Sequence, residues 1–598
     1  MDYSGIGNLA TAFFDQADRR TDQPFLWAKR DGSYRSWSWQ TVSDEVCRLA
    51  AGLIDLGVTE GDRVVIVSEN RPEWVVADLA VMAIGALSVP TYITNTTEDT
   101  RHIIEHSGAC AAIVSTDALM DTVLPAAEAV PECAHVIMID EGRSREAADG
   151  TRILPLQEIP DPGSERAALT RRNARAIARE ALCCLIYTSG TGGRPKGVML
   201  THASILANCA GAHDLLAEIG IGEETFLSLL PLSHAYEHTA GLMFPITIGA
   251  QIYYAEGPDR VAQNLQEARP TIMTAVPRLY EVLHDRIRRG VDQAGGLRAT
   301  MFHRAVATGR RRIGDPGSLT VSDRLLDPLL DRLVRRKVAA RFGGRLKAFV
   351  SGGAALNRDV GLFFLSLGVR ILQGYGQTET SPIVSCNRPG RIRIETVGPP
   401  FRGVELRIAD DGEILVRGDL LMKGYWRDQE STDATIVDGW LHTGDIGVID
   451  ADGALCITDR KKDIIVNSGG DTLSPARVEG FLTVDPDIAQ AMVSGDRRPW
   501  LAAVVVPSEE CIGEWSSRLD LPDLAALADD DRFQAALVAR VNEINATLSP
   551  VERVRRIIVA SEPFTTDNGL MTPTLKVRRH KVMEVYGGAL DRLYDRGG

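Results

Sequence analysis

The segment of this chain most suited to chemistry is residues 185–202, LIYTSGTGGRPKGVMLTH, in which hydroxyl side chains and glycines precede a lysine. The apolar run 181–187 predicts a buried strand, which stops at a hydroxyl- and glycine-rich loop, 188–193. Glycine permits positive φ and a close approach of the backbone to a ligand. Hydroxyls and exposed N–H groups would then face an anion, and Lys196 adds positive charge. The segment therefore predicts a polyphosphate site.

Two other interpretations of this loop are weaker. The phosphate loop of nucleotide hydrolases needs a glycine, four residues, and then Gly-Lys-Ser/Thr. Here Pro195 precedes Lys196 and Gly197 follows it, so that pattern is absent. A flexible surface turn is the second alternative, but a plain turn has no need for interleaved hydroxyls and glycines closed by Pro-Lys-Gly. We favour a phosphate loop of a different class.

Three later segments carry residue types that a nucleotide site needs. Ser-Gly-Gly-Ala-Ala at 351–355 follows a predicted strand, and such small residues would let a flat ring lie on the backbone. Gly-Tyr-Gly-Gln-Thr-Glu-Thr at 374–380 adds an aromatic ring and a carboxylate. Trp-Leu-His-Thr-Gly-Asp at 440–445 precedes the charged run 459–463. Each alone could be an ordinary turn after a strand, but their order after the first loop favours a single site.

Together these motifs resemble those of the AMP-forming acyl-adenylating superfamily, which includes acyl-CoA synthetases, coumarate–CoA ligases, beetle luciferases and peptide-synthetase adenylation domains. The resemblance spans nearly the whole chain and is closest to the bacterial long-chain fatty acyl-CoA synthetases. It implies that a medium- or long-chain fatty acid and ATP give an acyl-adenylate and pyrophosphate, after which the thiol of coenzyme A attacks the adenylate. ATP and coenzyme A are then substrates and Mg²⁺ a cofactor.

The same resemblance assigns roles in nucleotide binding. Tyr375 would stack on adenine, Thr378 would touch phosphate and Asp445 would accept from the ribose hydroxyls. Thr188 and Glu379 would bind Mg²⁺, which needs only one or two protein ligands when it bridges phosphate oxygens. The implied ATP and AMP site comprises Thr188, Ser189, Gly190, Thr191, Gly192, Gly353, Ala354, Ala355, Tyr375, Gly376, Thr378, Asp445 and Arg460.

The catalytic candidates implied by the resemblance are Lys196, His234 and Lys576. His234 falls where the family gates its acyl pocket, whereas His238 is interpreted as a core or pocket-wall residue. Lys576, in Thr-Pro-Thr-Leu-Lys, would reach the substrate carboxylate and the α-phosphate as a point charge on a flexible arm. The superfamily commonly has Ser-Gly-Lys here, and Thr-Leu-Lys matches its long-chain branch. A solvated lysine in a basic run is the alternative for Lys576.

The second reaction would depend on rotation of a small C-terminal domain. Lys462 falls at the position of the family's hinge. Gly469 and Gly470 would line the path of the pantetheine arm, because only a residue without Cβ lets a thiol chain pass against the backbone.

The elements that must position these motifs are alternating apolar strands and helices, which imply parallel sheets with covering helices. Residues 7–60 predict a leading helical region, and short strands from residue 405 predict a small distorted β-barrel. We therefore predict an α/β fold. A large N-terminal domain, 1–460, would combine mixed and parallel sheets, covering helices and the barrel. A small mobile α+β C-terminal domain, 461–598, would carry Lys576.

Composition narrows the function classes. The chain has 598 residues, 44% of them hydrophobic, and a net charge of −14, which disfavours a nucleic-acid partner. Nine cysteines form no Cys-x-x-Cys pair, and no signal peptide begins the chain, so we predict a cytoplasmic protein with reduced thiols. The apolar stretches 74–90 and 240–255 are too short or too polar to cross a membrane.

Residues 280–345 are rich in arginine and carry a helical pattern of leucines. Solvated surface helices are the favoured interpretation, but a basic face lying against an anionic membrane stays open, and with it membrane association. The segment resembles an insertion of long-chain acyl-CoA synthetases that coumarate ligases lack.

Three rival functions remain at this stage. The first is an acyl-AMP ligase that passes the acyl group to a carrier protein. The second is an aryl or amino-acid adenylating enzyme, against which the arginine-rich insertion argues. The third is a nucleotide-binding regulatory protein without turnover, against which Lys576 and Glu379 argue. No motif indicates the acyl chain length or the oligomeric state.

Overall fold

The computed structural model describes residues 2–141, 145–146, 150–188, 194–461, 463–469, 471–572 and 576–595. A nine-stranded sheet forms one layer of the larger body, and strands β3 to β6 and β8 run parallel. Its order is β19 (Gly424–Tyr425), β10 (Lys196–Thr201), β9 (Leu182–Thr188), β4 (Leu87–Thr91), β3 (Arg63–Val67), β5 (Ala111–Val114), β6 (His135–Met138), β8 (Arg152–Pro155) and β7 (Arg145–Glu146).

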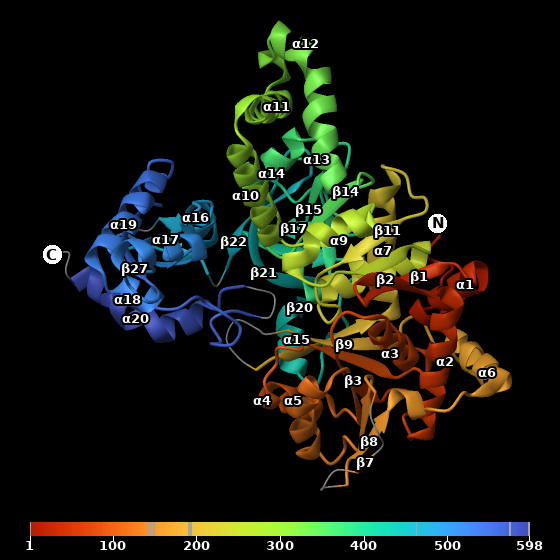
Figure 1. The fold of residues 1–598 in the computed structure, drawn as a ribbon. Helices are drawn as coiled ribbons and strands as arrows, with labels where there is room; N and C mark the ends of the chain where they lie inside the picture. Colours follow the sequence, from red (N-terminus) through yellow and green to blue (C-terminus); the bar gives the residue numbers. More distant parts are fainter. Residues whose placement is uncertain are drawn as a thin grey trace.

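A second sheet of eight strands forms the other large layer (Figure 1). Its central strands are parallel and fully buried, as expected when both faces of a parallel sheet are covered. Its order is β16 (Ile383–Cys386), β15 (Ile371–Gly376), β14 (Ala348–Ser351), β13 (Ile272–Ala275), β11 (Thr225–Ser228), β12 (Gln251–Tyr254), β1 (Pro24–Arg30) and β2 (Ser33–Ser38).

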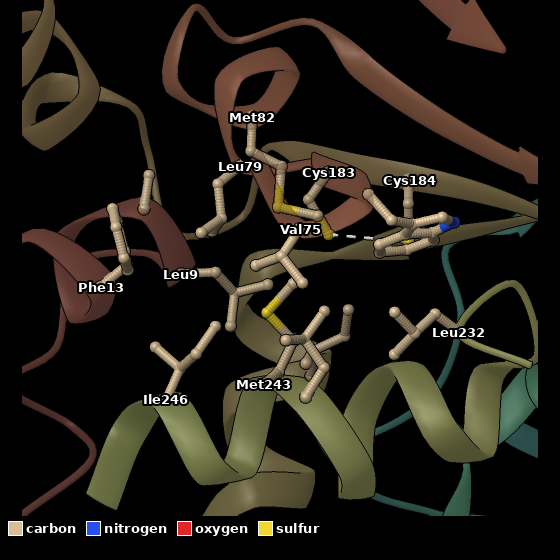
Figure 2. Packing of buried hydrophobic residues seen from close by; sticks show 14 of the residues in the cluster. Leu9, Phe13, Val75, Leu79, Met82, Cys183, Cys184, Leu232, Met243 and Ile246 are labelled. Carbon is tan, nitrogen blue, oxygen red and sulfur yellow. Dashed lines mark hydrogen bonds between the residues drawn. The ribbon is translucent and has the colours of Figure 1, made fainter. Parts of the chain in front are cut away.

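Helices between and around the two sheets fill the core. Every residue of α3 (Pro72–Ala83) is buried, because this helix contacts β3 and β4 of one sheet and β1 of the other. Figure 2 shows its side chains meeting those of β9, α1 and the continuous helix formed by η2 and α8. The other helices here are α1 (Leu9–Arg20), α2 (Trp39–Asp55), α4 (Thr97–Ser107), α5 (Asp117–Glu128), α6 (Gly163–Ala176), α7 (His202–Ala217), the π-helix η2 (Glu237–Met243), α8 (Phe244–Ile248) and α9 (Val261–Ala268).

A third, antiparallel sheet lies where the small barrel was expected. Its strands are β17 (Glu405–Ile408), β18 (Glu413–Arg417), β21 (Trp440–Ile449), β20 (Ile436–Val437) and β22 (Leu455–Arg460), and α15 (Gln429–Thr435) precedes β20. Strand β21 pairs with β22 so that Asp445 and Arg460 lie opposite each other. This register brings two motifs that are separate in the sequence to the same place.

The C-terminal unit has its own hydrophobic core, whose buried members among the described residues run from Ile465 to Leu590. A three-stranded sheet of β25, β26 and β27 lies at its centre. The proposed domain boundary after residue 460 stays a prediction. The elements of the C-terminal unit are β23 (Ile465–Val466), β24 (Thr472–Leu473), α16 (Pro475–Leu482), β25 (Ile488–Ser494), β26 (Leu501–Pro507), α17 (Glu509–Leu519), α18 (Leu524–Ala528), α19 (Asp531–Asn545), β27 (Val554–Val559) and α20 (Arg579–Asp595).

The arginine-rich segment forms a helical arm between β13 and β14 that projects from the large body, at the top of Figure 1. It rests on α14 (Arg358–Ser366) through α10 and α11. Its elements are α10 (Pro277–Ala294), α11 (Gly296–Gly314), the 3-10 turn η4 (Pro316–Ser318), α12 (Val321–Leu330), the π-helix η5 (Asp331–Arg335) and α13 (Arg336–Arg341).

One prediction about the first sixty residues was wrong. The segment is not helical throughout, because β1 and β2 form a hairpin within it. Asp31 and Gly32 make its turn with φ of 51° and 76°, and Asp-Gly is the residue pair that such two-residue turns favour. The turn signal was therefore present in the sequence.

Two further sequence predictions can be compared with the structure. All nine cysteines are free thiols, and most are buried. Within the described ranges, no helix combines the length and the apolar character that crossing a bilayer requires.

Candidate active site

The phosphate-loop motif begins and ends on a pair of antiparallel strands. Thr188, at the end of β9, lies opposite Lys196, at the start of β10. Ser189, Gly190, Thr191 and Gly192 lie outside the described residues. The pairing of the two strands fixes both ends of the loop next to each other at one end of β9 and β10.

Lys196 is held by the segment that follows β19. Its Nζ lies 3.2 Å from Asp428 Oδ2, donates to the Ser431 hydroxyl and sits 5.1 Å from the centroid of the Tyr425 ring. Hydrogen bonds from Ser431, together with Lys196, lower the pKa of Asp428. A phosphate group at the loop would compete with Asp428 for the lysine.

Tyr425 connects Lys196 to the carboxylate of Glu379. Its hydroxyl donates to Glu379 Oε1 at 2.9 Å, and the Glu379 carbonyl accepts from the Met422 N–H. Burial raises the pKa of Glu379, and Arg460 partly opposes that rise. Lys196, Tyr425 and Glu379 thus form a row at the foot of the loop, with a cation at one end and a carboxylate at the other.

Asp445 is the centre of a buried hydrogen-bond network. The Tyr375 hydroxyl donates to its Oδ2 at 2.6 Å, and Gln377 Nε2 donates to the same oxygen at 3.1 Å. Arg460 Nε lies 3.2 Å from the other carboxylate oxygen. Burial and the Asp445 charge hold the pKa of Tyr375 well above its usual range, so the phenol keeps its proton and remains a donor.

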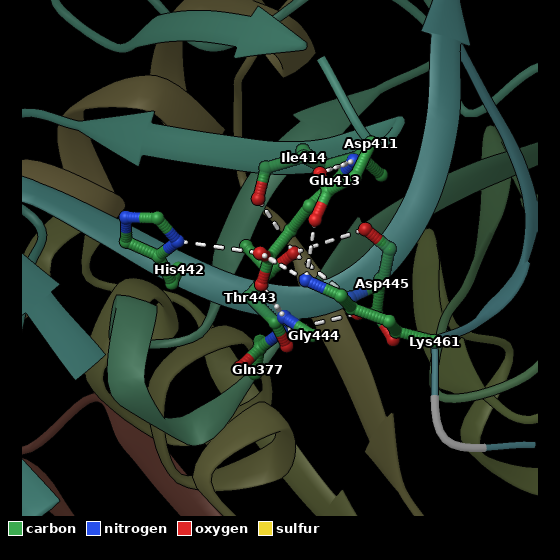
Figure 3. A network of polar contacts seen from close by, with 9 residues as sticks. All are labelled: Gln377, Asp411, Glu413, Ile414, His442, Thr443, Gly444, Asp445 and Lys461. Carbon is green, nitrogen blue, oxygen red and sulfur yellow. Dashed lines mark hydrogen bonds and ion pairs between the residues drawn. The ribbon is translucent and has the colours of Figure 1, made fainter. Parts of the chain in front are cut away.

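A second carboxylate, Glu413, fixes the part of strand β21 that carries Asp445 (Figure 3). Its Oε1 accepts from the Gly444 N–H at 2.8 Å, and its Oε2 lies 3.1 Å from Lys461 Nζ and 3.2 Å from His442 Nδ1. Lys461 also binds Asp411 at 2.6 Å, and its N–H donates to the Gly444 carbonyl. The residue just before Lys462 is therefore anchored to the third sheet, whereas Lys462 itself lies outside the described residues.

The small residues after β14 are exposed, as a shelf for a flat ring requires. Gly353, Ala354 and Ala355 are all open to solvent. Gly353 has a φ of 84°, a conformation that residues other than glycine rarely adopt. Gly376 has a purely structural explanation, because a Cβ there would lie 1.7 Å from the Pro382 carbonyl oxygen. Thr378 begins the short 3-10 helix, η6 (Thr378–Thr380), that carries Glu379.

Lys576 reaches this site from the C-terminal unit. Its backbone is fixed by two hydrogen bonds with Thr572, and its side chain has exposed surface although protein atoms around it desolvate the amine. Desolvation, together with the positive charge of Arg460, lowers the pKa of Lys576 to about 8, and Asp445 opposes that shift. Lys576 thus lies within electrostatic reach of Asp445 and Arg460.

His234 also lies within electrostatic reach of Lys576. Burial and the lysine charge lower the pKa of His234 to about 4, so its imidazole is neutral near pH 7. Its Nδ1 accepts the Tyr236 N–H at 3.1 Å, which places the ring proton on Nε2. His238, by contrast, is fully buried and bonded to Asp78 at 3.0 Å, as expected of a core residue.

An apolar cavity lies between α7, the η2–α8 helix and the eight-stranded sheet. Leu215, Phe226, Phe244, Ile383 and Phe401 are among its lining residues, and Thr274 contributes the polar side chain of the lining. Its volume is about 20 Å³, so the cavity would have to widen before it could take an acyl chain. The Phe401 ring lies directly over Gly211, where a Cβ would come within 2.2 Å of it.

Comparisons with known proteins agree with this geometry. The profile of the AMP-binding enzyme family matches residues 13–426, and that of the AMP-binding enzyme C-terminal domain matches residues 462–597. This chain belongs to the AMP-binding enzyme family. In this AMP-binding enzyme, Tyr375 and Arg460 contact Asp445, and Lys196 and Glu379 lie together at the base of the loop. Gly469 lies in an exposed turn bonded to Asn467, and Gly470 lies outside the described residues.

Two relatives and one solved structure illustrate what this AMP-binding enzyme is similar to. It is 35% identical to the long-chain-fatty-acid–CoA ligase FadD15 of Mycobacterium tuberculosis, over 98% of this chain and 97% of that protein. It is 30% identical to the peroxisomal long chain acyl-CoA synthetase 7 of Arabidopsis thaliana, over 99% and 87%. The A domain of a carboxylic acid reductase from Segniliparus rugosus, in complex with AMP, shares its fold with a TM-score of 0.78 at 22% identity, over 99% and 94%.

Sequence reasoning missed three residues of this site. Gln377 donates a hydrogen bond to Asp445, and Tyr425 lies between Lys196 and Glu379. Glu413 accepts a hydrogen bond from the Gly444 N–H. Gln377 lies inside a motif that was already singled out, so its amide was a visible signal. Tyr425 and Glu413 reach the site through strand pairing over long distances in the sequence, and no local pattern marks them.

Replacing the carboxylate of Glu379 tests its predicted role in holding Mg²⁺. Glu379→Gln removes one charged oxygen from a hard cation, so we expect the Mg²⁺ concentration for half-maximal pyrophosphate exchange to rise at least about tenfold. Glu405→Gln, which loses an exposed ion pair with Arg417 instead, is the matched control. A Mg²⁺ titration unchanged in Glu379→Gln would remove this residue from the metal site.

The lowered pKa of Lys576 predicts an alkaline limb in the first half-reaction. A role for the charged amine in adenylation predicts that kcat/KM for ATP in pyrophosphate exchange is level below pH 7 and falls as the pH rises through about 8. Bound ATP would raise that pKa, and the fall in kcat should come at higher pH. Lys576→Arg keeps its charge and should lose the limb. If Lys576→Arg kept the same limb, another group would be titrating.

Proposed function

We propose that this chain is a long-chain fatty acid–CoA ligase that makes an acyl-adenylate from a fatty acid and ATP and then transfers the acyl group to coenzyme A. The observation that carries this proposal is the 35% identity with a long-chain-fatty-acid–CoA ligase over 98% of this chain and 97% of that protein. The match extends over the adenylation motifs and over the C-terminal unit that carries Lys576.

The described residues support an adenylation step in which charged side chains bind the nucleotide and stabilise the transition state. Lys196 would bind the phosphates in place of Asp428, and Asp445 would accept from the ribose. Arg460 and Lys576 would stabilise the charge that develops as the fatty-acid carboxylate attacks the α-phosphorus and pyrophosphate leaves. Tyr375 would support the adenine from the side opposite the shelf at 353–355.

The donor set near the loop fits Mg²⁺. Glu379 and Thr188 supply hard oxygen atoms, and the metal would neutralise and orient the phosphate oxygens when bound. Within the described part of the chain, no three His, Cys, Asp or Glu residues form a metal cluster. A cation held by one or two protein oxygens together with phosphates needs no such cluster.

The fatty acyl chain would enter the apolar cavity, and we propose that His234 stands at its entrance. The lining is compatible with hydrocarbon, and the neutral imidazole avoids placing a second charge at the entrance. Because the cavity is narrow, we propose that Phe244 or Phe401 changes rotamer when the chain binds. The polar Thr274 on its wall is bonded to the buried Glu237, which would limit where a chain methylene can pass.

The second step would use a rotated C-terminal domain, 461–598, moving about Lys462 against the N-terminal domain, 1–460. Lys461 is anchored by Asp411 and Glu413, which would confine the torsion change to the next residue. Rotation would withdraw Lys576 and bring the turn of Gly469 and Gly470 toward the adenylate. We also propose that the protein works in the cytoplasm on these small-molecule substrates.

An acid panel tests the proposal. Pyrophosphate release should be measured with ATP, Mg²⁺ and coenzyme A for saturated acids from C4 to C20, and for benzoate and amino acids. We expect the highest kcat/KM near C12 to C18 and acyl-CoA as the product. Turnover restricted to benzoate or amino acids, or adenylate made without transfer to coenzyme A, would contradict it.

A further inference from the structure

The helical arm differs in charge from the rest of the molecule. Residues 277–345 hold sixteen arginines and lysines against seven aspartates and glutamates, whereas the whole chain has a net charge of −14. The arm also projects away from both large sheets (Figure 1). A strongly basic projection on an acidic protein indicates a surface for an anionic partner.

Helix α12 exposes large apolar side chains along one face. Val321, Leu325, Leu329 and Leu333 are 75%, 76%, 47% and 37% exposed. They recur every four residues and continue from α12 into η5, so they form one stripe. Residues on the opposite face, Asp323, Leu330 and Val334, are buried against the arm. We call Val321, Leu325, Leu329 and Leu333 the apolar stripe.

The cations next to the stripe are available to a partner. Asp323 is paired with Arg304 and Arg311, and Asp327 with Arg312 and Arg335, so the acidic residues of α12 are already occupied inside the arm. Arg324 and Arg332 are exposed beside the stripe, and neither has an ion-pair partner among the residues that the structure describes. Hydrophobic side chains and free guanidinium groups therefore share one face.

We propose that this arm docks on an anionic lipid bilayer, with the apolar stripe entering the headgroup region and Arg324 and Arg332 pairing with lipid phosphates. A surface helix with an apolar face and flanking arginines is the arrangement that binds such an interface. A nucleic acid would use the arginines but leave the leucines in water. The sequence favoured helices that are simply solvated, but such helices would not expose four large apolar side chains along one face.

Docking there would hold the acyl site near the source of its substrate. The arm joins the body between β13 and β14, whose Ile272, Thr274 and Val350 line the apolar cavity. Long-chain fatty acids partition into bilayers. A protein held to the membrane by this arm would keep that cavity close to the lipid surface.

Vesicle co-sedimentation of the full chain tests the proposal independently of catalysis. Wild type should bind vesicles of equal phosphatidylglycerol and phosphatidylcholine, and bind pure phosphatidylcholine at least tenfold more weakly. Leu325→Ser with Leu329→Ser should weaken binding to the mixed vesicles about tenfold or more, since each leucine loses its burial in lipid. Arg324→Gln with Arg332→Gln should mainly abolish the preference for phosphatidylglycerol, as should high salt.

The controls separate docking from misfolding and from self-association. Val585→Ser, on α20, removes an apolar side chain that is 59% exposed elsewhere and should bind like wild type. Every variant should keep wild-type turnover of octanoate, a soluble acid. Wild type that ignores anionic vesicles, or a leucine variant that binds as wild type does, overturns the proposal. So does a wild-type dimer that Leu325→Ser with Leu329→Ser converts to monomer, because the stripe would then join two copies.

Discussion

Lys576→Ala is expected to slow formation of acyl-AMP from ATP and a fatty acid by about 10³-fold, the cost typical of losing one preorganised charge-stabilising group. The same variant should form acyl-CoA from supplied acyl-AMP at close to the wild-type rate. The reason is position: in this structure Lys576 lies within electrostatic reach of Arg460 and Asp445, and the thioester step would withdraw it.

The matched control for this variant is Lys581→Ala. Lys581 belongs to the same basic run but pairs with Glu584 on the surface, so both half-reactions should stay near wild type. Stopped assays of pyrophosphate release and of acyl-CoA from acyl-AMP measure the two steps separately. If Lys576→Ala slows both steps equally, a two-conformation cycle does not describe this enzyme.

Lys462→Pro is expected to separate the two steps in the opposite sense. Proline fixes φ near −65° and removes a donor, so a residue that must change torsion is held in one conformation. Because Lys576 lies within electrostatic reach of Asp445 and Arg460 in this structure, we expect adenylation near wild type and acyl-CoA formation slowed by about 10²-fold, the cost of a small misplacement of reacting groups.

One control variant separates the effect of the torsion from the effect of the lysine side chain. Lys462→Ala removes the same lysine side chain but leaves the torsion free, so it should form acyl-CoA almost normally. Quenched-flow measurement of acyl-AMP and acyl-CoA in one reaction gives both rates. Normal thioester formation in Lys462→Pro would place the pivot elsewhere, for instance on the other side of the anchored Lys461.

Local pattern was enough to predict most of the fold that positions the site. Strand β9 (Leu182–Thr188) lies within one residue of the predicted run 181–187, because an apolar run that stops at turn residues specifies a strand. The hairpin of β1 and β2 was missed because its alternation is irregular. Its outer strand is largely solvent-exposed, and its inner strand gains its stability by pairing with β12, far away in the sequence.

In the candidate site too, local motifs were predictable from the sequence and long-range contacts were not. Motif residues such as Thr188, Tyr375 and Asp445 could be chosen from the sequence, but their contacts could not. The bond from Tyr375 to Asp445 joins strands of two different sheets, and the pairing of Asp445 with Arg460 follows from the register of β21 and β22 within one sheet. The exposed stripe on α12 was also unpredictable, since the leucine period fits a buried face equally well.

The most direct test of the account is a single-turnover reaction of the wild-type protein with palmitate, ATP, Mg²⁺ and coenzyme A, quenched over time and analysed by mass spectrometry. The account predicts palmitoyl-AMP that rises first and decays as palmitoyl-CoA appears, with one pyrophosphate and one AMP per thioester. Palmitoyl-CoA formed with ADP and phosphate, or no palmitoyl-AMP while benzoyl-AMP accumulates from benzoate, would contradict it.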